Sequence, residues 1–338
     1  VRLILAIFAF CFPVFAQAAF WHKPPSAPTA GYGSTENYLT DQITETTRGS
    51  ATDGTFTWIY EPAVLKEGQR APVIVFLHGF AALNPVVYRS HINHLVRQGN
   101  IVIYPQFQIA KGSGVLAESG LKGKVDQNVW ARRAVSVVQD ALQSLGDKVD
   151  SQQIYIYAHS LGGLIASAWE ANGGPKPARY VLAHPAFDST AGQPAFVRAL
   201  VKVDPIQWQE TARHITSPVI ILHGEEDQIA SLTQSETFVA QLQTQGTPYA
   251  VYKALRDAYG HPALSPNHGA PCDHISPIPS NLKFFGMSFE LNALDYRYYF
   301  AGLDAVMAGE SDAALPFDMG TWSNGHGAKT PQLHLHSP

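Results

Sequence analysis

One run of residues constrains the fold of this chain most. It consists of four apolar, β-prone residues followed by a turn of small residues. Residues 154–157 read Ile-Tyr-Ile-Tyr, and residues 158–163 read Ala-His-Ser-Leu-Gly-Gly. The centre of this run differs from G-x-S-x-G only in Ala158, which replaces the first glycine. The pattern predicts a strand that turns sharply into a helix and exposes the hydroxyl of Ser160. A small-residue turn that serves packing alone is the alternative.

Strand and helix signals alternate on both sides of this run. Short apolar or alternating segments predict strands, and helical spacing predicts longer helices between them. The expected strands are 55–60, 72–77, 100–104, 153–157, 178–183, 218–222 and 249–255. The expected helices are 85–97, 126–145 with Asp126 as N-cap, 232–242 and 289–307. Such alternation predicts an α/β fold, with a mostly parallel central sheet covered by helices on both faces.

The N-terminal residues have the features of an export signal. A basic residue, Arg2, precedes an apolar stretch over residues 3–15, and Ala-Gln-Ala at 16–18 fits a cleavage site. We therefore expect a signal peptide over 1–18 and a secreted or periplasmic protein. Cleavage would remove Cys11 and leave Cys272 as the single cysteine, so no intrachain disulfide is expected.

Composition divides the remaining chain and excludes some partners. Residues 19–50 are expected to form a loose segment, residues 51–309 the α/β domain, and residues 310–338 a peripheral tail. The tail contains His334 and His336, which we expect to be disordered. A net charge of −4 provides no basic surface for nucleic acid, and no apolar run after the leader is long enough for a stable membrane span.

The chain offers groups that could assist a nucleophilic serine, each placed after a strand. The strand at 72–77 runs into His-Gly-Phe, so the backbone N–H groups of Phe80 and Leu161 could bind a developing oxyanion. Asp227 follows the strand at 218–222 and is the expected acid. Asp188, after the preceding strand, is the alternative.

Three histidines after the last strand could serve as the base. His261, His268 and His274 can all be reached by a loop, so spacing does not decide among them. Two further histidines, His91 and His94, lie one helical turn apart. With no third ligand apparent nearby, they are interpreted as surface or helix-packing residues, and no metal site is expected.

Over residues 55–308 the chain resembles the α/β-hydrolase superfamily. Within it, the chain is similar to small secreted bacterial carboxylesterases and lipases, the branch with cutinase-like polyester hydrolases and chlorophyllase-like enzymes. Related sequences carry H-G-x-P-x-L-x-A-D-H-x-A-P before an L-D-Y-Y-G-like helix. Residues 259–271 read Tyr-Gly-His-Pro-Ala-Leu-Ser-Pro-Asn-His-Gly-Ala-Pro, and Leu-Asp-Tyr follows at 294–296. This alignment implies that His268 is the base.

The resemblance implies a serine hydrolase that cleaves small-molecule or polymeric carboxylic esters without a cofactor. Ser160, His268 and Asp227 would form its triad. A peptidase or acyltransferase of the same fold is one alternative, and a catalytically silent binding protein is another. The oligomeric state is left open.

The connection over residues 186–217 is short for a lid. It predicts an open cleft, with an apolar wall formed by Phe187, Phe196, Ile206 and Trp208.

Overall fold

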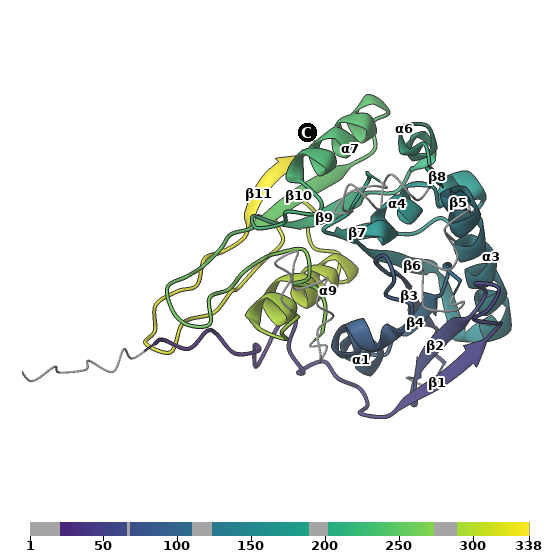
Figure 1. Cartoon of the computed structure of the whole chain (residues 1–338). Coiled ribbons are helices and arrows are strands. Elements are labelled where there is room, and N and C mark those ends of the chain that lie inside the picture. The colour runs from purple at the N-terminus through teal and green to yellow at the C-terminus, as the bar shows by residue number, and fades with distance from the viewer. Residues whose placement is uncertain (1–20, 66–67, 110–123, 189–201, 274–288, 338) are drawn as a thin grey trace, which may run out of the picture.

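A twisted sheet of nine described strands forms the centre of the molecule (Figure 1). The computed structural model describes residues 21–65, 68–109, 124–188, 202–273 and 289–337. The strand order is β1-β2-β4-β3-β6-β7-β9-β10-β11. The strands are β1 Ile43–Arg48, β2 Thr57–Pro62, β3 Ala71–Leu77, β4 Ile101–Pro105, β6 Val149–His159, β7 Arg179–Ala183, β9 Val219–Gly224, β10 Tyr249–Ala254 and β11 Gln332–His336.

The six strands from β4 to β10 in this order run parallel, which confirms the mostly parallel sheet. The three remaining strands pair antiparallel, with β1 and β2 at one end of the sheet and β11 at the other. Two short strands, β5 Lys124–Asp126 and β8 Lys202–Asp204, pair outside the main sheet.

Helices cover both faces of the sheet, as Figure 1 shows. On one face lie α3 Gln127–Leu145, α4 Leu161–Ser167, α6 Trp208–Thr211 and α7 Leu232–Thr244. On the other lie α1 Arg89–Arg97 and a helix that begins with the π-helical segment η5 Asp295–Phe300 and continues as α9 Ala301–Met307. Short 3-10 turns are η1 Pro85–Tyr88, η2 Gly146–Lys148, η3 Glu170–Asn172 and η4 Ala212–His214. No helix in the described part of the chain has the length and apolar character that crossing a bilayer requires.

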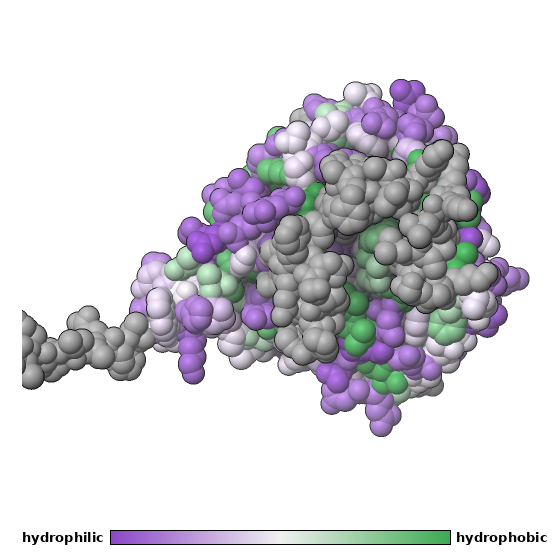
Figure 2. Space-filling view, in the orientation of Figure 1, coloured by the Kyte–Doolittle hydropathy of each residue, from purple (hydrophilic) through white to green (hydrophobic). Residues whose placement is uncertain are grey.

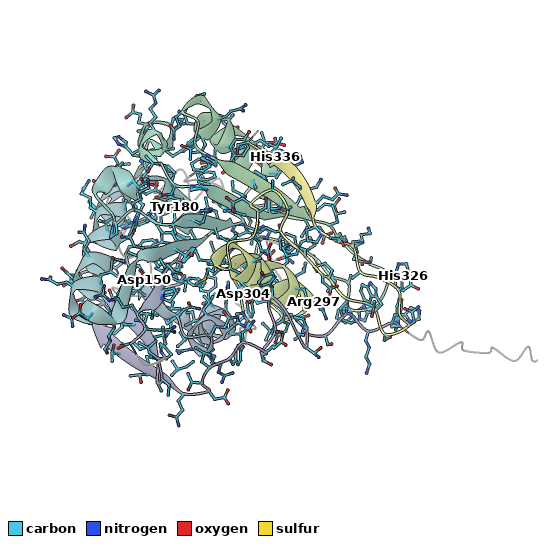
Figure 3. All side chains as sticks on the ribbon, turned by 180° about the vertical axis from the view of Figure 1, so that it is seen from behind. Asp150, Tyr180, Arg297, Asp304, His326 and His336 are labelled. Atoms are coloured by element: carbon cyan, nitrogen blue, oxygen red, sulfur yellow. The ribbon has the colours of Figure 1, made fainter. Side chains whose placement is uncertain are left out.

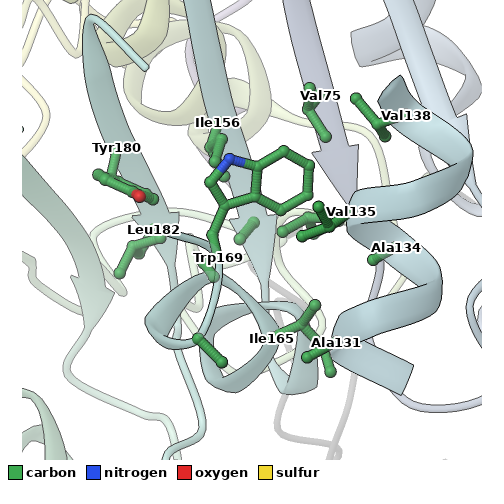
Figure 4. Packing of buried hydrophobic residues seen from close by; sticks show 14 of the residues in the cluster. Val75, Ala131, Ala134, Val135, Val138, Ile156, Ile165, Trp169, Tyr180 and Leu182 are labelled. Carbon is green, nitrogen blue, oxygen red and sulfur yellow. The ribbon is translucent and has the colours of Figure 1, made fainter. Parts of the chain in front are cut away.

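Each face of the sheet has its own hydrophobic core. On the α3 side, the buried indole of Trp169 packs among Val135 and Val138 of α3 and Ile156 of β6 (Figure 4). Its ring N–H donates to the carbonyl of Pro175 at 2.9 Å, so the buried polar atom is satisfied. This packing fixes α4 against β6, and the turn between these two elements contains Ser160.

Both ends of the chain extend the sheet further than the sequence indicated. The expected loose segment contributes β1, and the expected tail contributes β11, in which Nε2 of His334 lies 2.8 Å from a carboxylate oxygen of Glu236. The prediction that His334 and His336 lie in a disordered tail is wrong (His336 is labelled in Figure 3). These strands are polar and mostly exposed, because edge strands bury few side chains, and they therefore lack the apolar signal of the central strands.

Segments from both ends of the chain also meet the loop that follows β10. The N–H of His261 donates to the carbonyl of His22 at 2.9 Å, and Lys23 exchanges hydrogen bonds with Ser323. Trp322 donates its ring N–H to Asp257 at 3.1 Å. In Figure 3 these segments form an extension of the molecule, with His326 near its end. The loop that bears His268 is thus held by the N-terminal and C-terminal segments.

Candidate functional site

The carboxyl ends of five neighbouring strands meet at one edge of the sheet. β3 ends at Leu77, β6 at His159, β7 at Ala183, β9 at Gly224 and β10 at Ala254, and the ladder register keeps these ends side by side. In open α/β sheets, ligands bind outside this edge. The residues that follow these strands include every site residue expected from the sequence that the structure describes.

Ser160 lies in a strained turn between β6 and α4. Its φ of 55° and ψ of −121° are unusual for a residue with a side chain. A Cβ atom at Gly162 would collide with the carbonyl oxygen of Leu77, and one at Gly163 would collide with Pro185. Glycine is therefore required at both positions. The site of Ala158 is inside β6, where its methyl group is fully buried in the core. Alanine in place of the first glycine is thus compatible with the turn.

Three polar side chains form a continuous hydrogen-bonded chain at this edge. The Oγ of Ser160 lies 2.7 Å from Nε2 of His268, and Nδ1 of His268 lies 2.8 Å from Oδ2 of Asp227. All three side chains are buried or nearly so. A serine, an imidazole and a carboxylate in this order can transfer a proton from the hydroxyl while the carboxylate stabilises the imidazolium.

Asp227 is held as a carboxylate by four N–H donors. Its Oδ1 accepts from the backbone N–H groups of Ile229 and Ala230, each at 2.9 Å. Its Oδ2 accepts from Nδ1 of His268 and from Nδ1 of a second histidine, His184, at 2.7 Å. Burial alone would raise the pKa of Asp227, but the two histidine donors outweigh burial and hold that pKa well below its ordinary value. The site therefore contains a permanent negative charge.

The alternatives considered for the base and the acid lie elsewhere. His261 is exposed and packs its ring 5.5 Å from that of Trp21. Asp188 is exposed, and it is Asp227 that hydrogen-bonds to His268. His274 lies outside the described residues. Among the described candidates, only His268 and Asp227 join Ser160.

The two expected oxyanion donors belong to loops at the same edge. Phe80 and Leu161 have no backbone N–H partner within the described residues. The loop around Phe80 is held by the N–H of Ala81, which donates to Gln108 at 3.0 Å, and by His78, whose Nδ1 lies 2.7 Å from the carbonyl oxygen of Gly79. Burial lowers the pKa of His78 to about 4, so its ring is neutral at pH 7.

One tyrosine–histidine pair connects three of these loops. The hydroxyl of Tyr88 accepts from the N–H of Gly79 at 3.1 Å and donates to Nδ1 of His159 at 2.8 Å. Nε2 of His159 donates to the carbonyl of His268 at 2.8 Å. His159 directly precedes Ser160 in the sequence, whereas no motif marks Tyr88. Both residues link the oxyanion loop, the serine turn and the loop of the base.

His184 was not singled out from the sequence. It directly follows β7, and its ring bonds to Asp227 and, at 2.6 Å, to the hydroxyl of Tyr299. Within the described chain, His184, Asp227 and His268 are the one group whose potential metal-ligand atoms lie within 4.8 Å of one another. Both Nδ1 atoms point to one carboxylate oxygen, and Nε2 of His184 is bonded to Tyr299. This is the geometry of a hydrogen-bonded cluster rather than of a set of metal ligands.

The expected apolar wall differs from the observed packing. Phe187 and Ile206 are buried in the core, and the ring of Phe187 stacks on Phe238 of α7 at 4.0 Å. Trp208 packs against the same pair of rings, and Phe196 lies outside the described residues. The exposed apolar side chain beside the serine turn is Phe80, at 48% exposure. On the face in Figure 2, hydrophilic residues prevail along the outline, and hydrophobic residues form small groups nearer the middle.

A buried carboxyl group near the site makes stability depend on pH. Asp273 accepts from the N–H of Ser90, at the start of α1, at 2.6 Å. Burial raises the pKa of Asp273 from 3.8 to about 6, more than this hydrogen bond lowers it. Its contribution to stability is complete below pH 4 and is lost as pH rises through 6. Asparagine does not titrate in this range. Between pH 4 and pH 8 the unfolding free energy of the wild type should therefore fall by about 3 kcal/mol relative to that of Asp273→Asn.

Urea unfolding of both proteins across this range measures that difference. The matched control is Asp41→Asn, because the Asp41 side chain is 89% exposed. The control should follow the wild type at every pH. A constant difference between Asp273→Asn and the wild type would contradict the assignment of the titration to Asp273.

A family model described as Chlorophyllase matches residues 45–226, which is more than half of the chain. The match includes the strand–turn–helix unit of Ser160 and ends one residue before Asp227. No curated protein matches the sequence.

Solved structures of similar fold include esterases and peptidases. The carboxylesterase Cest-2923 from Lactobacillus plantarum is 15% identical, with a TM-score of 0.50 over 63% of this chain and 82% of that one. Esterase 2 of Thermogutta terrifontis is 15% identical, with a TM-score of 0.49 over 72% and 91%. An acylaminoacyl peptidase from Pyrococcus horikoshii is 17% identical, with a TM-score of 0.47 over 68% and 38%.

This chain spans 33–38% of the length of three peptidases that it matches. Together with the sheet topology, the family match and the esterase of Lactobacillus plantarum agree with the α/β-hydrolase fold expected from the sequence.

Proposed function

Because the chain belongs to the chlorophyllase family, we propose that it is a secreted serine hydrolase that cleaves carboxylic esters. One observation carries this proposal: the hydrogen-bonded chain from Ser160 through His268 to Asp227 at the carboxyl edge of the sheet. The family match ends before Asp227, so the acid and the base are assigned from contacts and not from the match. Export rests on the leader at residues 1–18, which lies outside the described residues.

In the proposed first half-reaction, Oγ of Ser160 attacks the ester carbonyl carbon. Nε2 of His268 takes the hydroxyl proton, because it already accepts a hydrogen bond from Oγ at 2.7 Å. Asp227 holds Nδ1 of His268 protonated, so that Nε2 has the free lone pair, and it stabilises the imidazolium that forms. The imidazolium then protonates the leaving alcohol, and the acyl group remains on Ser160.

The tetrahedral intermediate needs donors for its negative oxygen. We assign this role to the backbone N–H groups of Phe80 and Leu161, for which the described residues provide no competing acceptor. One such donor is typically worth about 3 kcal/mol of the barrier. Water then attacks the acyl-enzyme, with His268 as its base, and releases the acid. Every proton transfer in this sequence uses the same imidazole.

Ester cleavage is favoured over amide cleavage by family membership, and the fold by itself does not separate them. The experiment is a panel of p-nitrophenyl esters from acetate to long acyl chains, with the matching p-nitroanilides and chlorophyll. We expect steady turnover of one or more esters, with kcat/KM well above that of the anilide of the same acyl group. The dependence on acyl length and on the alcohol then identifies the substrate class.

Three results would contradict the proposal. Higher kcat/KM for an anilide than for its ester would make the protein a peptidase or amidase. Transfer of the acyl group to an added alcohol, with little free acid formed, would make it an acyltransferase. A folded wild type that turns over no ester and no anilide would agree with a binding protein.

A further inference from the structure

Three residues other than glycine have a positive φ in the described chain, and all three follow strands at the carboxyl edge. They are Ala81 after β3, Ser160 after β6 and His184 after β7, with φ values of 64°, 55° and 46°. A backbone in this region is unfavourable for residues with a side chain and tends to occur at functional sites. Ala81 and Ser160 belong to the proposed oxyanion loop and serine turn. The strain at His184 has no role in the mechanism described so far.

The surroundings of His184 hold it in one orientation. The side chain is fully buried, and its backbone N–H donates to the carbonyl of Leu222 at 3.0 Å. A Cβ atom at Gly224 would lie 2.6 Å from Cε1 of His184, so glycine at the end of β9 makes room for this ring. The histidine therefore fills a site that the neighbouring strands are shaped to accept.

The two ring nitrogens of His184 have defined roles. Nδ1 faces the carboxylate of Asp227 at 2.7 Å and must donate, because that oxygen has no hydrogen. Burial lowers the pKa of His184 more than Asp227 raises it, so the ring is neutral and Nε2 accepts from Tyr299. The fully buried hydroxyl of Tyr299 thus fixes the tautomer that donates to Asp227.

We propose that His184 is a positioning residue, which orients Asp227 and shares its Oδ2 atom with His268. The inference rests on the proposed function, since it gives His184 a role in the same triad. Two N–H donors on one oxygen hold the carboxylate plane in place more firmly than one. Both donors also draw on the negative charge of Oδ2. The electrostatic attraction between Asp227 and protonated His268 is therefore weaker than it would be with an unshared carboxylate.

Other ionisable groups around this cluster are neutral at pH 7. From β6, His159 has its ring centre 5.1 Å from that of His268, and burial lowers its pKa well below the ordinary value. From β9, His223 lies 3.9 Å from Asp227, and burial lowers its pKa to about 4.

From the helix side, burial raises the pKa of Tyr299 well above its ordinary value, as it does for its neighbours Tyr157, Tyr298 and Asp295. Asp227 is therefore the charged group in direct contact with His268.

Removing the second donor should change the pH dependence of the reaction. In His184→Leu, His268 is the remaining hydrogen-bond donor to Oδ2, and its protonated form gains the full charge of Asp227. Because the base must be neutral to act, the acidic limb of the kcat/KM profile should move to higher pH by about one unit. A purely structural role for His184 would lower activity at every pH and leave the position of that limb unchanged.

A conservative variant and a matched control complete the kinetic test. Asparagine tolerates positive φ, and its amide can take the place of Nδ1 as donor, so His184→Asn should keep the limb near its wild-type position. The control is His91→Leu, because His91 is a fully buried histidine with no hydrogen-bond partner within the described structure. Its acidic limb should match that of the wild type.

A second measurement uses the wild type and needs no turnover. In ¹⁵N-histidine-labelled protein, the donors from His184 and His268 should give two strongly deshielded Nδ1–H signals. His184→Asn should lose one of these signals, and His268→Gln the other.

Protonation of His184 at Nε2 instead of Nδ1 would overturn the inference even if His184→Leu does not fold. An acidic limb of the kcat/KM profile that stays at its wild-type pH in folded His184→Leu would also overturn the inference. A wild type that hydrolyses no ester but shows both signals would refute the proposed function and leave the shared carboxylate standing.

Discussion

Replacing Ser160 with alanine is expected to lower kcat for the best ester about 10⁶-fold. Ser160 is the sole nucleophile in the proposed reaction, and His268 cannot act without a hydroxyl to deprotonate. The fold should remain, because the Oγ atom bonds only to His268 within the described residues, and the backbone contacts of the turn do not involve it. Initial rates with the wild type and Ser160→Ala, at equal concentrations of folded protein, measure the loss.

The matched control is Ser167→Ala in α4, the short helix that follows Ser160. Ser167 is also buried, and its hydroxyl donates to the carbonyl of Leu164 at 2.7 Å, away from the site. This variant should stay within a few-fold of the wild type. A folded Ser160→Ala protein with more than a small fraction of wild-type turnover would remove serine catalysis from the account.

The second large effect is expected for His268→Gln, with a loss in kcat that approaches that of Ser160→Ala. Glutamine roughly keeps the size of the side chain but cannot accept the serine proton and later return it. Because nucleophile and base act as a unit, the double variant with Ser160→Ala should be no slower than either single variant. Steady-state kinetics of the three proteins test this non-additivity.

His261→Gln is the matched control for this prediction. His261 belongs to the same loop, but its ring is exposed and packs beside Trp21. It should retain near wild-type kcat, and Asp227→Asn should lose about 10⁴-fold. The opposite ranking, with His261→Gln inactive and His268→Gln active, would move the base to another residue.

The central sheet could be predicted from the sequence because its strands are buried on both faces. Runs such as Val219–Leu222 are continuous and apolar, and this pattern admits few interpretations in a chain with helical segments between the runs. The expected strand at 178–183 corresponds to β7 within one residue. Burial in the core determines these strands, and in the sequence it is visible as a run of apolar residues.

The outer strands could not be predicted in this way. In β1, Ile-Thr-Glu-Thr-Thr-Arg has five exposed positions, and its pairing depends on the backbone of β2. β11 similarly pairs with β10 across about 80 residues of chain. Backbone pairing of polar segments depends on contacts distant in sequence, for which a single sequence has no local signal.

The candidate site shows the same division between local and distant information. Ser160 has a local motif, and a loop after β9 suggested Asp227. Spacing did not decide which of three histidines is the base, and a family resemblance favoured His268. The structure places His268 within hydrogen-bond distance of both Ser160 and Asp227.

His184 and Tyr88 have no motif around them. Their positions become informative only when β7 and the turn before α1 are placed next to the serine turn. A histidine directly after a parallel strand is the one sequence signal that could have drawn attention to His184.

The most direct test of serine catalysis is to locate the adduct of a fluorophosphonate, which reacts with activated serines. The wild type should gain one adduct per chain, and peptide mapping by mass spectrometry should place it on Ser160. Ser160→Ala should gain none, and His268→Gln should react far more slowly, because the hydroxyl lacks its base. An adduct on another residue, or an unmodified wild type that still hydrolyses esters, would contradict the account.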